Sequence, residues 1–348
     1  MIEKLALRIL VLILSFSISV WIIIVLNSYS YKKNHKENDF IRLFPPHKVT
    51  PLKSTDLQLN SYYIAGILEN TIYLGNITAP ALLTKINLGL DSFTRTVLKF
   101  PSFVKSIGNG SRLILKSGNL FLMDGRSPFI FSCDLRTYHL TLISDKTPFS
   151  KAIPVSASSF VSRIYDDTLQ QDILVKGNDK LKRTSRFVPA KQKDGIFSVD
   201  GILASDESGK NIFYTFYYRN SFYRLDSDLH QIYRANTIDT NFLAKIELGK
   251  LGKENNITFS SPPVFVNKIC FVSDKYVYIH SSLKANNEDQ SRFDEVSVID
   301  VYNIESGKYR YSFYLENKNG QRISDFSVSG NTLVAITDRF LFVYSLSL

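Results

Sequence analysis

The chain has 348 residues, and 42 Lys+Arg against 32 Asp+Glu give it a formal net charge of +10. The excess is uneven: residues 1–50 hold seven basic and three acidic side chains, and residues 176–193 hold seven basic and one acidic. Nucleic-acid binding normally needs a broad basic face or stripe, so this distribution argues against a nucleic-acid partner. A hydrophobic share of 44% with 21% charged residues excludes a disordered chain and a multi-span membrane protein.

The first segment of the chain predicts a membrane anchor. No charged residue occurs between Ile9 and Tyr31, and residues 9–26 are almost wholly apolar. As an α-helix they would measure roughly 27 Å, close to the hydrocarbon core of about 30 Å. A cleaved signal peptide is the alternative, but its apolar region usually runs only about 7–15 residues before an A-x-A-like site. The nearest match here is the poor Ser28-Tyr29-Ser30, so we expect an uncleaved signal-anchor over residues 1–31.

The positive-inside rule does not decide the orientation of this anchor, because the numbers of basic groups on its two sides are nearly equal. Lys4 and Arg8 precede the apolar stretch, whereas Lys32, Lys33 and Lys36 follow it. Because the segment is typical of a signal-anchor, we expect the large C-terminal domain outside the cytoplasm. In a bacterium this would be a single-pass inner-membrane protein with that domain in the periplasm.

Beyond about residue 60 the pattern is β almost throughout, with runs of Ile, Val, Phe, Tyr and Thr between Gly, Asn, Asp and Ser. Three hairpin-like segments superpose without a gap: 114–123, 270–279 and 334–343. Weaker copies turn at Glu69, Asp167 and Ser208. Six β units at intervals of about 40–65 residues are typical of a propeller. We therefore predict an all-β, six-bladed β-propeller over 61–348, preceded by a single transmembrane helix.

The ring of such a propeller has to be closed, and the last unit offers only three strands after Gly320. We predict residues 32–60 as a linker that donates the closing strand from around Phe40–Thr50. The rival architecture is two β-sandwich domains, which would also show alternating strands. That rival gives no reason for hairpins at similar intervals.

The strings Val272-Ser-Asp-Lys-Tyr-Val-Tyr-Ile279 and Ile336-Thr-Asp-Arg-Phe-Leu-Phe-Val343 resemble the TolB-like and NHL-like six-bladed propellers of bacterial envelope proteins. The resemblance covers most of the chain beyond residue 60 and rests on repeat architecture, without a family-specific motif. It implies a propeller in the cell envelope and no particular activity. The single tryptophan is Trp21, in the anchor, so the Trp-Asp signature of WD40 repeats is missing.

Local motifs for catalysis or metal binding are also missing from the sequence. Cys133 and Cys270 have no zinc spacing, and they fall in the second and fifth units, on opposite sides of a ring of six. A disulfide needs Cα atoms within about 7 Å, so we expect two buried free thiols. None of the five histidines forms H-E-x-x-H, and G-x-S-x-G is absent. We predict no catalytic, cofactor or metal residue, and the cofactor is unknown.

The candidate binding residues are the basic side chains of the charged segment. They are Lys176, Lys180, Lys182, Arg183, Arg186, Lys191 and Lys193. Alternation along a strand would put several of them on one face, where they would meet anionic headgroups, an acidic partner or an anionic ligand. The alternative is a solvated edge strand protected by its lysines. The aromatic run Phe213–Tyr223 has two interpretations: a platform for a sugar, peptide or quinone, or packing between blades.

These observations predict a membrane-tethered, extracytoplasmic β-propeller that acts as a ligand- or protein-binding module. Its predicted partners are the membrane, through residues 9–26, and either an envelope protein or an anionic ligand. The alternative is an envelope enzyme, a hydrolase or lyase, whose site lies in the central channel, where residues from several blades meet. A third possibility is a structural subunit of an envelope assembly.

Overall fold

The computed structural model describes residues 2–34, 38–104, 107–108, 110–144, 148–178, 183–251 and 256–347. Helix α1 (Ile2–Asn34) contains the apolar stretch Arg8–Leu26, which is long enough to cross a membrane. None of that stretch is buried against the rest of the protein. The predicted N-terminal apolar helix is therefore confirmed as a candidate membrane span.

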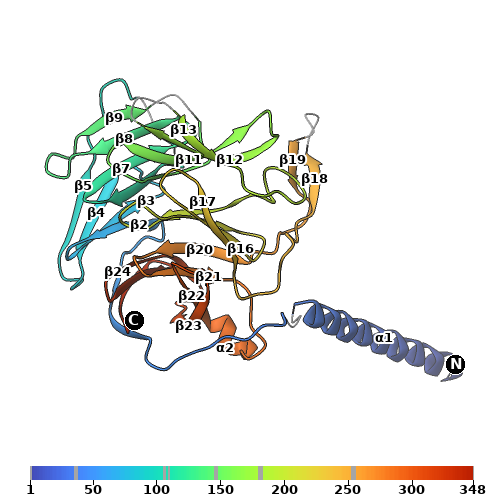
Figure 1. Ribbon diagram of the computed structural model, residues 1–348. Helices are drawn as coiled ribbons and strands as arrows, with labels where there is room; N and C mark the ends of the chain where they lie inside the picture. Colours follow the sequence, from blue (N-terminus) through green and yellow to red (C-terminus); the bar gives the residue numbers. More distant parts are fainter. Residues whose placement is uncertain are drawn as a thin grey trace.

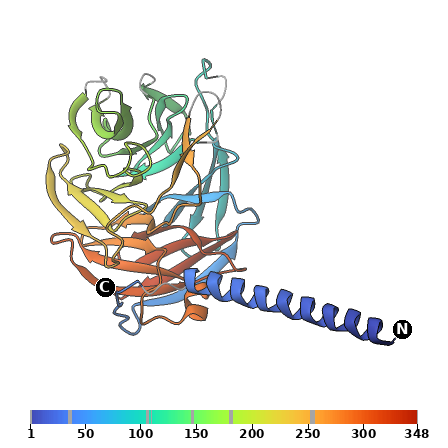
Figure 2. The same ribbon diagram turned by 90° about the vertical axis from the view of Figure 1, so that its right-hand side faces the viewer.

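Within the described residues, six four-stranded antiparallel sheets follow one another around a ring (Figures 1 and 2). From the channel outward, the first three blades are β2 (Tyr62–Leu68), β3 (Thr71–Asn76), β4 (Leu82–Asn87), β5 (Phe93–Val97); β6 (Arg112–Lys116), β7 (Asn119–Asp124), β8 (Phe129–Cys133), β9 (Leu140–Ser144); and β10 (Lys151–Pro154), β11 (Ser159–Asp166), β12 (Gln171–Asn178), β13 (Arg183–Phe187). The other three are β14 (Gly201–Ser205), β15 (Ile212–Phe216), β16 (Ser221–Leu225), β17 (Gln231–Asn236); β20 (Asn267–Val272), β21 (Tyr276–Ser281), β22 (Val296–Asn303), β23 (Tyr309–Glu316); and β24 (Ile323–Ser329), β25 (Thr332–Thr337), β26 (Phe340–Leu346), β1 (Val49–Asp56).

The innermost strands β2, β6, β10, β14, β20 and β24 contact one another in that order, and β24 contacts β2. The ring is therefore closed, and the predicted six-bladed β-propeller is confirmed. Two sandwiches would leave no such ring. We call the side on which the innermost strands begin the start face, and the side on which they end the end face. Since the strands alternate in direction, connections between blades lie on the start face.

The closing strand is β1, which pairs antiparallel with β26 as the outermost strand of the sixth blade. It lies further along the chain than the stretch Phe40–Thr50 named from the sequence. A register shift between Pro51 and Lys53 interrupts the pairing, and proline is tolerated at such an edge position. Joining the two ends of the chain in one sheet removes a free edge that another chain could extend.

The three superposed hairpins occupy two different positions in their blades. Residues 114–123 and 270–279 join the first and second strands, whereas 334–343 join the second and third. The marker Asp167 likewise lies between a second and a third strand. The predicted number of blades was right, but the hairpins were assigned to the wrong positions within a blade. Second strands such as β7, β15 and β25 are buried along almost their whole length, so successive hairpins of one blade have similar apolar patterns.

Two polar stretches carry elements beyond the six blades. Gly249–Asn256 overlaps the hairpin of β18 (Leu248–Leu251) and β19 (Asn256–Phe259), between the fourth and fifth blades. Lys284–Asp294 overlaps the short helix α2 (Gln290–Glu295), between β21 and β22. Both insertions therefore lie in connections on the start face.

The two cysteines lie where the blade count placed them. Cys133 ends β8 in the second blade and Cys270 lies on β20 in the fifth, and both are buried free thiols. That prediction is confirmed. Their side chains belong to separate hydrophobic clusters, each formed where two blades pack together.

The described chain from Asn38 to Lys48 is held along the fourth and fifth blades. The backbone N–H of Asn38 donates to Oδ1 of Asn286 at 3.1 Å, and its carbonyl accepts from Oγ1 of Thr240 at 2.6 Å. Arg42 is only 3% exposed and pairs with Asp300 and Glu288. Although burial opposes its charge, these two carboxylates raise the pKa of Arg42. Asn38 is thus fixed beside two start-face connections.

Candidate binding site at the central channel

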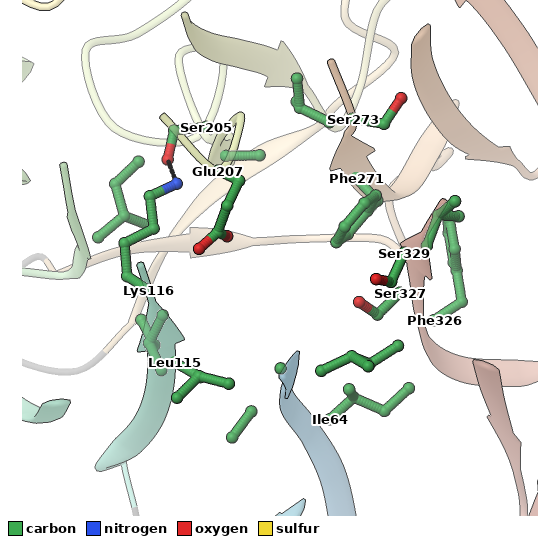
Figure 3. Close-up of a pocket in the computed structure, with 18 of the residues that line it drawn as sticks. Ile64, Leu115, Lys116, Ser205, Glu207, Phe271, Ser273, Phe326, Ser327 and Ser329 are labelled. Atoms are coloured by element: carbon green, nitrogen blue, oxygen red, sulfur yellow. Dashed lines mark hydrogen bonds between the residues drawn. The ribbon is translucent and has the colours of Figure 1, made fainter. Parts of the chain in front are cut away.

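A cavity of about 440 Å³ occupies the channel and is lined by innermost strands from all six blades (Figure 3). Its lining is mixed: apolar side chains such as Ile64, Leu115 and Phe326 lie beside serine hydroxyls. The charged residues Lys116, Glu207, Asp274 and Asp325 also line it. A concave site with both apolar and polar groups suits ligand binding. Among the described residues, no three His, Cys, Asp or Glu side chains gather to hold a metal ion.

The end of this cavity is bridged by hydrogen bonds between the second and fourth blades. Lys116, the last residue of β6, donates from Nζ to Oγ of Ser205 at 2.9 Å and to the carbonyl oxygen of Asp206. The backbone N–H of Ser117 donates to Oε1 of Glu207 at 2.5 Å. Burial lowers the pKa of Lys116, and the charge of Glu207 opposes that shift. These bonds join the two blades on either side of the third blade, whose innermost strand β10 has only four residues.

A second hollow of about 540 Å³ lies where the innermost strands of the third to sixth blades begin. We call it the start-face cleft. The residues that line it are Lys151, Asp200, Tyr217, Tyr218, Phe265, Lys268, Ile269, Ile323 and Ser324. The ring of Phe265 lies 5.8 Å from that of Tyr217 and 5.0 Å from that of Tyr218, measured between centroids. Three aromatic rings from two connections therefore form one wall of the cleft.

Lys151, at the start of β10, is a fixed cation that lies against this wall, with its Nζ 4.2 Å from the ring centroid of Tyr217. Its Nζ lies 2.6 Å from the carbonyl oxygen of Gly201, 2.8 Å from the hydroxyl of Tyr217 and 3.3 Å from Oδ1 of Asp200. Burial lowers the pKa of Lys151 to about 8, although Asp200 opposes the shift. All three N–H donors of the ammonium are used by the protein, so its geometry is set before any ligand arrives.

Behind Lys151 lies a buried network that holds Asp200 in place. Arg163 of β11 pairs with Asp200, and its Nε lies 3.5 Å from Oδ2 of Asp172 and 2.7 Å from the hydroxyl of Ser150. Burial raises the pKa of Asp172, and the charge of Arg163 opposes this shift. The network joins the third and fourth blades and stabilises one wall of the cleft.

Lys268 differs from Lys151 because no carboxylate in the described part of the chain pairs with it. Its side chain is exposed at the cleft, near the beginning of β20. Partial burial of its side chain lowers the pKa of Lys268, and the nearby guanidinium of Arg322 lowers it further. Burial also lowers the pKa of Arg322, whose Nη2 donates to the carbonyl oxygen of Phe293 at 3.0 Å. Arg322 is outside the lining of the cleft and is offset by the charges of Asp294 and Glu288, so Lys268 is the member of this pair that lines the cleft.

The basic segment predicted from the sequence is split by strand β13. Lys176 on β12 pairs with Asp228 at 2.8 Å, near the end-face turn that joins β12 to β13. Lys180 and Lys182 lie outside the described residues, and so does the side chain of Arg183. Arg186 is exposed on β13.

Lys191 and Lys193 follow β13 in the next connection, on the start face. The Nζ atom of Lys191 lies 3.4 Å from the carbonyl oxygen of Leu169, and that of Lys193 lies 2.7 Å from that of Ile246. No hydrogen bond or ion pair joins any two of the described members of this segment. Its anion- or partner-binding role stays a prediction, and the two groups belong to opposite faces.

The aromatic run is divided between two places in the structure, and its role as a binding platform stays a prediction. Phe213, Tyr214 and Phe216 are fully buried between blades, while Tyr217 and Tyr218 line the start-face cleft. Lys151 and Lys268 were missed because they are separated from the run in sequence and belong to other blades. The available signal was a lysine at the beginning of an inner strand in two different units.

Comparisons with known proteins support the fold and leave the family open. No family model matches the chain, and no curated protein matches it. Among solved structures, a protein of Bacteroides fragilis NCTC 9343 described as a "putative exported protein" has a TM-score of 0.53 at 10% identity, covering 89% of this chain and 95% of that one. A chain of the mitotic checkpoint complex has a TM-score of 0.46 at 11% identity, covering 90% and 95%. At these identities the first likeness shows the fold alone, and nothing is argued from the second.

Proposed function

We propose that this protein is a membrane-tethered, extracytoplasmic β-propeller that binds an anionic ligand in its start-face cleft. The tether is α1, whose apolar stretch Arg8–Leu26 is exposed along its length. The likeness to a protein described as exported supports a location outside the cytoplasm. Propeller channels and their mouths are concave sites held by rigid strands, which suits a binding module.

The observation that carries this proposal is the chemistry of the cleft. Lys268, with which no carboxylate in the described chain pairs, lies at a hollow of about 540 Å³ walled by the rings of Tyr217, Tyr218 and Phe265. Lys151 lines the same hollow and is already held by Asp200 and Tyr217. Cations and aromatic faces together suit an acidic group carried on a planar or ring-shaped body, such as an acidic sugar or an aromatic acid. The acid would lie near Lys268, and the ring would stack on the aromatic wall.

Thermal unfolding of the full chain in detergent tests this proposal. The probes are galacturonate and 4-hydroxybenzoate, compared with the neutral galactose and phenol. We expect the acids to raise the unfolding temperature in proportion to the logarithm of their concentration, because a ligand that binds only the folded state stabilises it. The neutral probes should leave it unchanged.

Two lysine variants separate the cleft from general charge effects. Lys268→Ala should abolish the shift, whereas Lys275→Ala should retain it, because Lys275 is an exposed lysine on an end-face turn. A shift that survives in Lys268→Ala would place binding elsewhere. No shift with either acid in the unchanged protein would contradict an acidic ring-shaped ligand.

A further inference from the structure

The start face carries an exposed patch beside the point where the anchor joins the propeller. The connection after β17 presents Phe242 and Leu243, which are 59% and 69% exposed, and the exposed Lys245. Its neighbour, the connection after β13, presents the exposed Lys191 and Lys193. We call these five residues the loop patch. Exposed aromatic and aliphatic side chains surrounded by lysines are typical of a surface that contacts a membrane interface.

The two connections of the loop patch are joined to each other. The side-chain amide of Gln192 donates from Nε2 to the carbonyl oxygen of Phe242 at 2.8 Å, and Nζ of Lys193 donates to that of Ile246 at 2.7 Å. Among the described residues, Glu247 is an exposed acid of the same connection, and the exposed Asp39 follows Asn38, which is bonded to Thr240. The lysines therefore outnumber the neighbouring exposed carboxylates, and the patch as a whole is cationic.

The anchor joins the propeller next to this patch. Oγ1 of Thr240, two residues before Phe242, donates to the carbonyl oxygen of Asn38 at 2.6 Å. Helix α1 ends at Asn34, and the chain between Asn34 and Asn38 spans at most about 14 Å. The helical residues between Leu26 and Asn34 add about 12 Å. Asn38 therefore lies within roughly 26 Å of the apolar span, and about 5–7 Å of that is the headgroup layer.

Arg42 prevents this joint from acting as a free hinge. Four residues after Asn38, its guanidinium is enclosed in the fifth blade by Asp300, Glu288 and Ser281. The described chain is thus fixed to the propeller from Asn38 onward. Because the connection to the span is short and its attachment point is fixed, only part of the propeller surface can meet the bilayer. The hairpin of β18 and β19, which follows the loop patch in the chain, lies on the same side of the propeller as α1 (Figure 1).

From this placement we propose that the loop patch lies on the anionic headgroup surface of the membrane that α1 crosses, with Phe242 and Leu243 inserted among the lipids. This inference rests on the tether of the proposed function. Aromatic and aliphatic tips suit the interface, and each nearby lysine is attracted by anionic lipids. It gives Lys191 and Lys193 a role that Lys176, whose partner Asp228 lies on the end face, does not share.

Quenching of tryptophan fluorescence by brominated lipids tests this placement in the full chain. Trp21 is the chain's single tryptophan, so it reports the anchor in the unchanged protein. Replacing it by Trp21→Phe allows Phe242→Trp to report the patch. The matched control is Trp21→Phe with Phe93→Trp, because Phe93 is 45% exposed at the beginning of β5, on the end face. Proteoliposomes contain brominated phosphatidylcholine with or without phosphatidylglycerol.

We expect quenching of Trp21 and of the Phe242→Trp reporter, and none of the Phe93→Trp reporter. Quenching of Trp21 without quenching at position 242 would overturn the inference and leave the tether intact. Equal quenching at positions 242 and 93 would also overturn it, because no face would be selected. An unquenched Trp21 would remove the tether, and the inference would fall with it.

Charge reversal tests the electrostatic part of the inference. Lys191→Glu with Lys193→Glu should lower the ratio of docked to undocked protein, read from the Phe242→Trp reporter, by roughly five-fold or more in phosphatidylglycerol vesicles. Lys210→Glu with Lys275→Glu, two exposed lysines on end-face turns, should leave it unchanged. An equal loss from both pairs would show a general charge effect and would contradict docking through the loop patch.

Discussion

Nε of Arg42 donates to Oδ1 of Asp300 at 2.7 Å, although the two residues are 258 positions apart in the sequence. Nη2 reaches the second oxygen of the same carboxylate at 3.1 Å, and Glu288 pairs with Nη1. This contact buries a residue that precedes the propeller inside its fifth blade. From Asn38 onward, the described segment before β1 is hydrogen-bonded to the propeller.

Arg42→Ala should destabilise the protein by about 3–5 kcal/mol, because it leaves Asp300 and Glu288 buried without their cation. Denaturant unfolding followed by near-ultraviolet circular dichroism measures the loss. Arg339→Ala is the matched control, because the Arg339–Asp56 pair has side chains 49% and 37% exposed. Exposed pairs contribute below about 1 kcal/mol. Equal small losses in both variants would contradict a structural role for Arg42.

His280 makes stability depend on pH. The side chain is fully buried, and neither ring nitrogen has a hydrogen-bond partner among the described residues. Burial, together with the charges of Lys268 and Arg322, lowers the pKa of His280 to about 3. At a pH below about 6.5, the pKa of histidine in the unfolded chain, His280 binds a proton in the unfolded state but not in the folded state. The contribution of His280 to stability therefore falls as the pH drops from about 6.5 towards 3.

Asp325 acts in the opposite direction, because burial raises its pKa to about 6 and the folded state then binds the extra proton. Comparing the unchanged protein with His280→Leu cancels this contribution. Between pH 6.5 and 5, the variant should gain about 2 kcal/mol of unfolding free energy relative to the unchanged protein. Parallel pH profiles for the two proteins would show that His280 does not titrate as described.

The cysteines should be unreactive in the folded protein. Burial raises the pKa of the Cys133 thiol to about 11 and that of the Cys270 thiol to about 12, and the thiolate is the reactive form. A thiol reagent at pH 8 should modify neither residue before denaturation and both afterwards, as counted by mass spectrometry. A mass lower by two hydrogen atoms after non-reducing denaturation would reveal a disulfide and contradict the blade assignment.

The fold was predictable because strands buried on both sides give a strong and repeated apolar signal. The closing strand was harder to place. Val49–Asp56 is mostly exposed and contains Pro51, so it lacks an apolar alternation. Residues 40–44 alternate better, but Phe40 is buried against the propeller and Arg42 is inside it. A local pattern cannot distinguish a strand from a segment fixed by a buried ion pair.

The candidate site was predictable only in part. The run containing Tyr217 and Tyr218 was recognised, because adjacent aromatics mark either packing or binding. Lys151 and Lys268 were not, because their proximity depends on how the third and fifth blades meet at the channel. The basic segment failed to indicate one surface for a related reason. A strand carries its two ends to opposite faces, so charges that are close in sequence separate in space.

The central claim is that α1 spans a membrane and holds the propeller outside the cytoplasm. Fusions of alkaline phosphatase or green fluorescent protein after Leu348, expressed in a bacterial host, test it most directly. The phosphatase is active only outside the cytoplasm, whereas the fluorescent protein does not fluoresce when it is exported unfolded. We predict active phosphatase and a dark fluorescent fusion in the membrane fraction. A fluorescent fusion with inactive phosphatase would place the propeller in the cytoplasm and contradict the account.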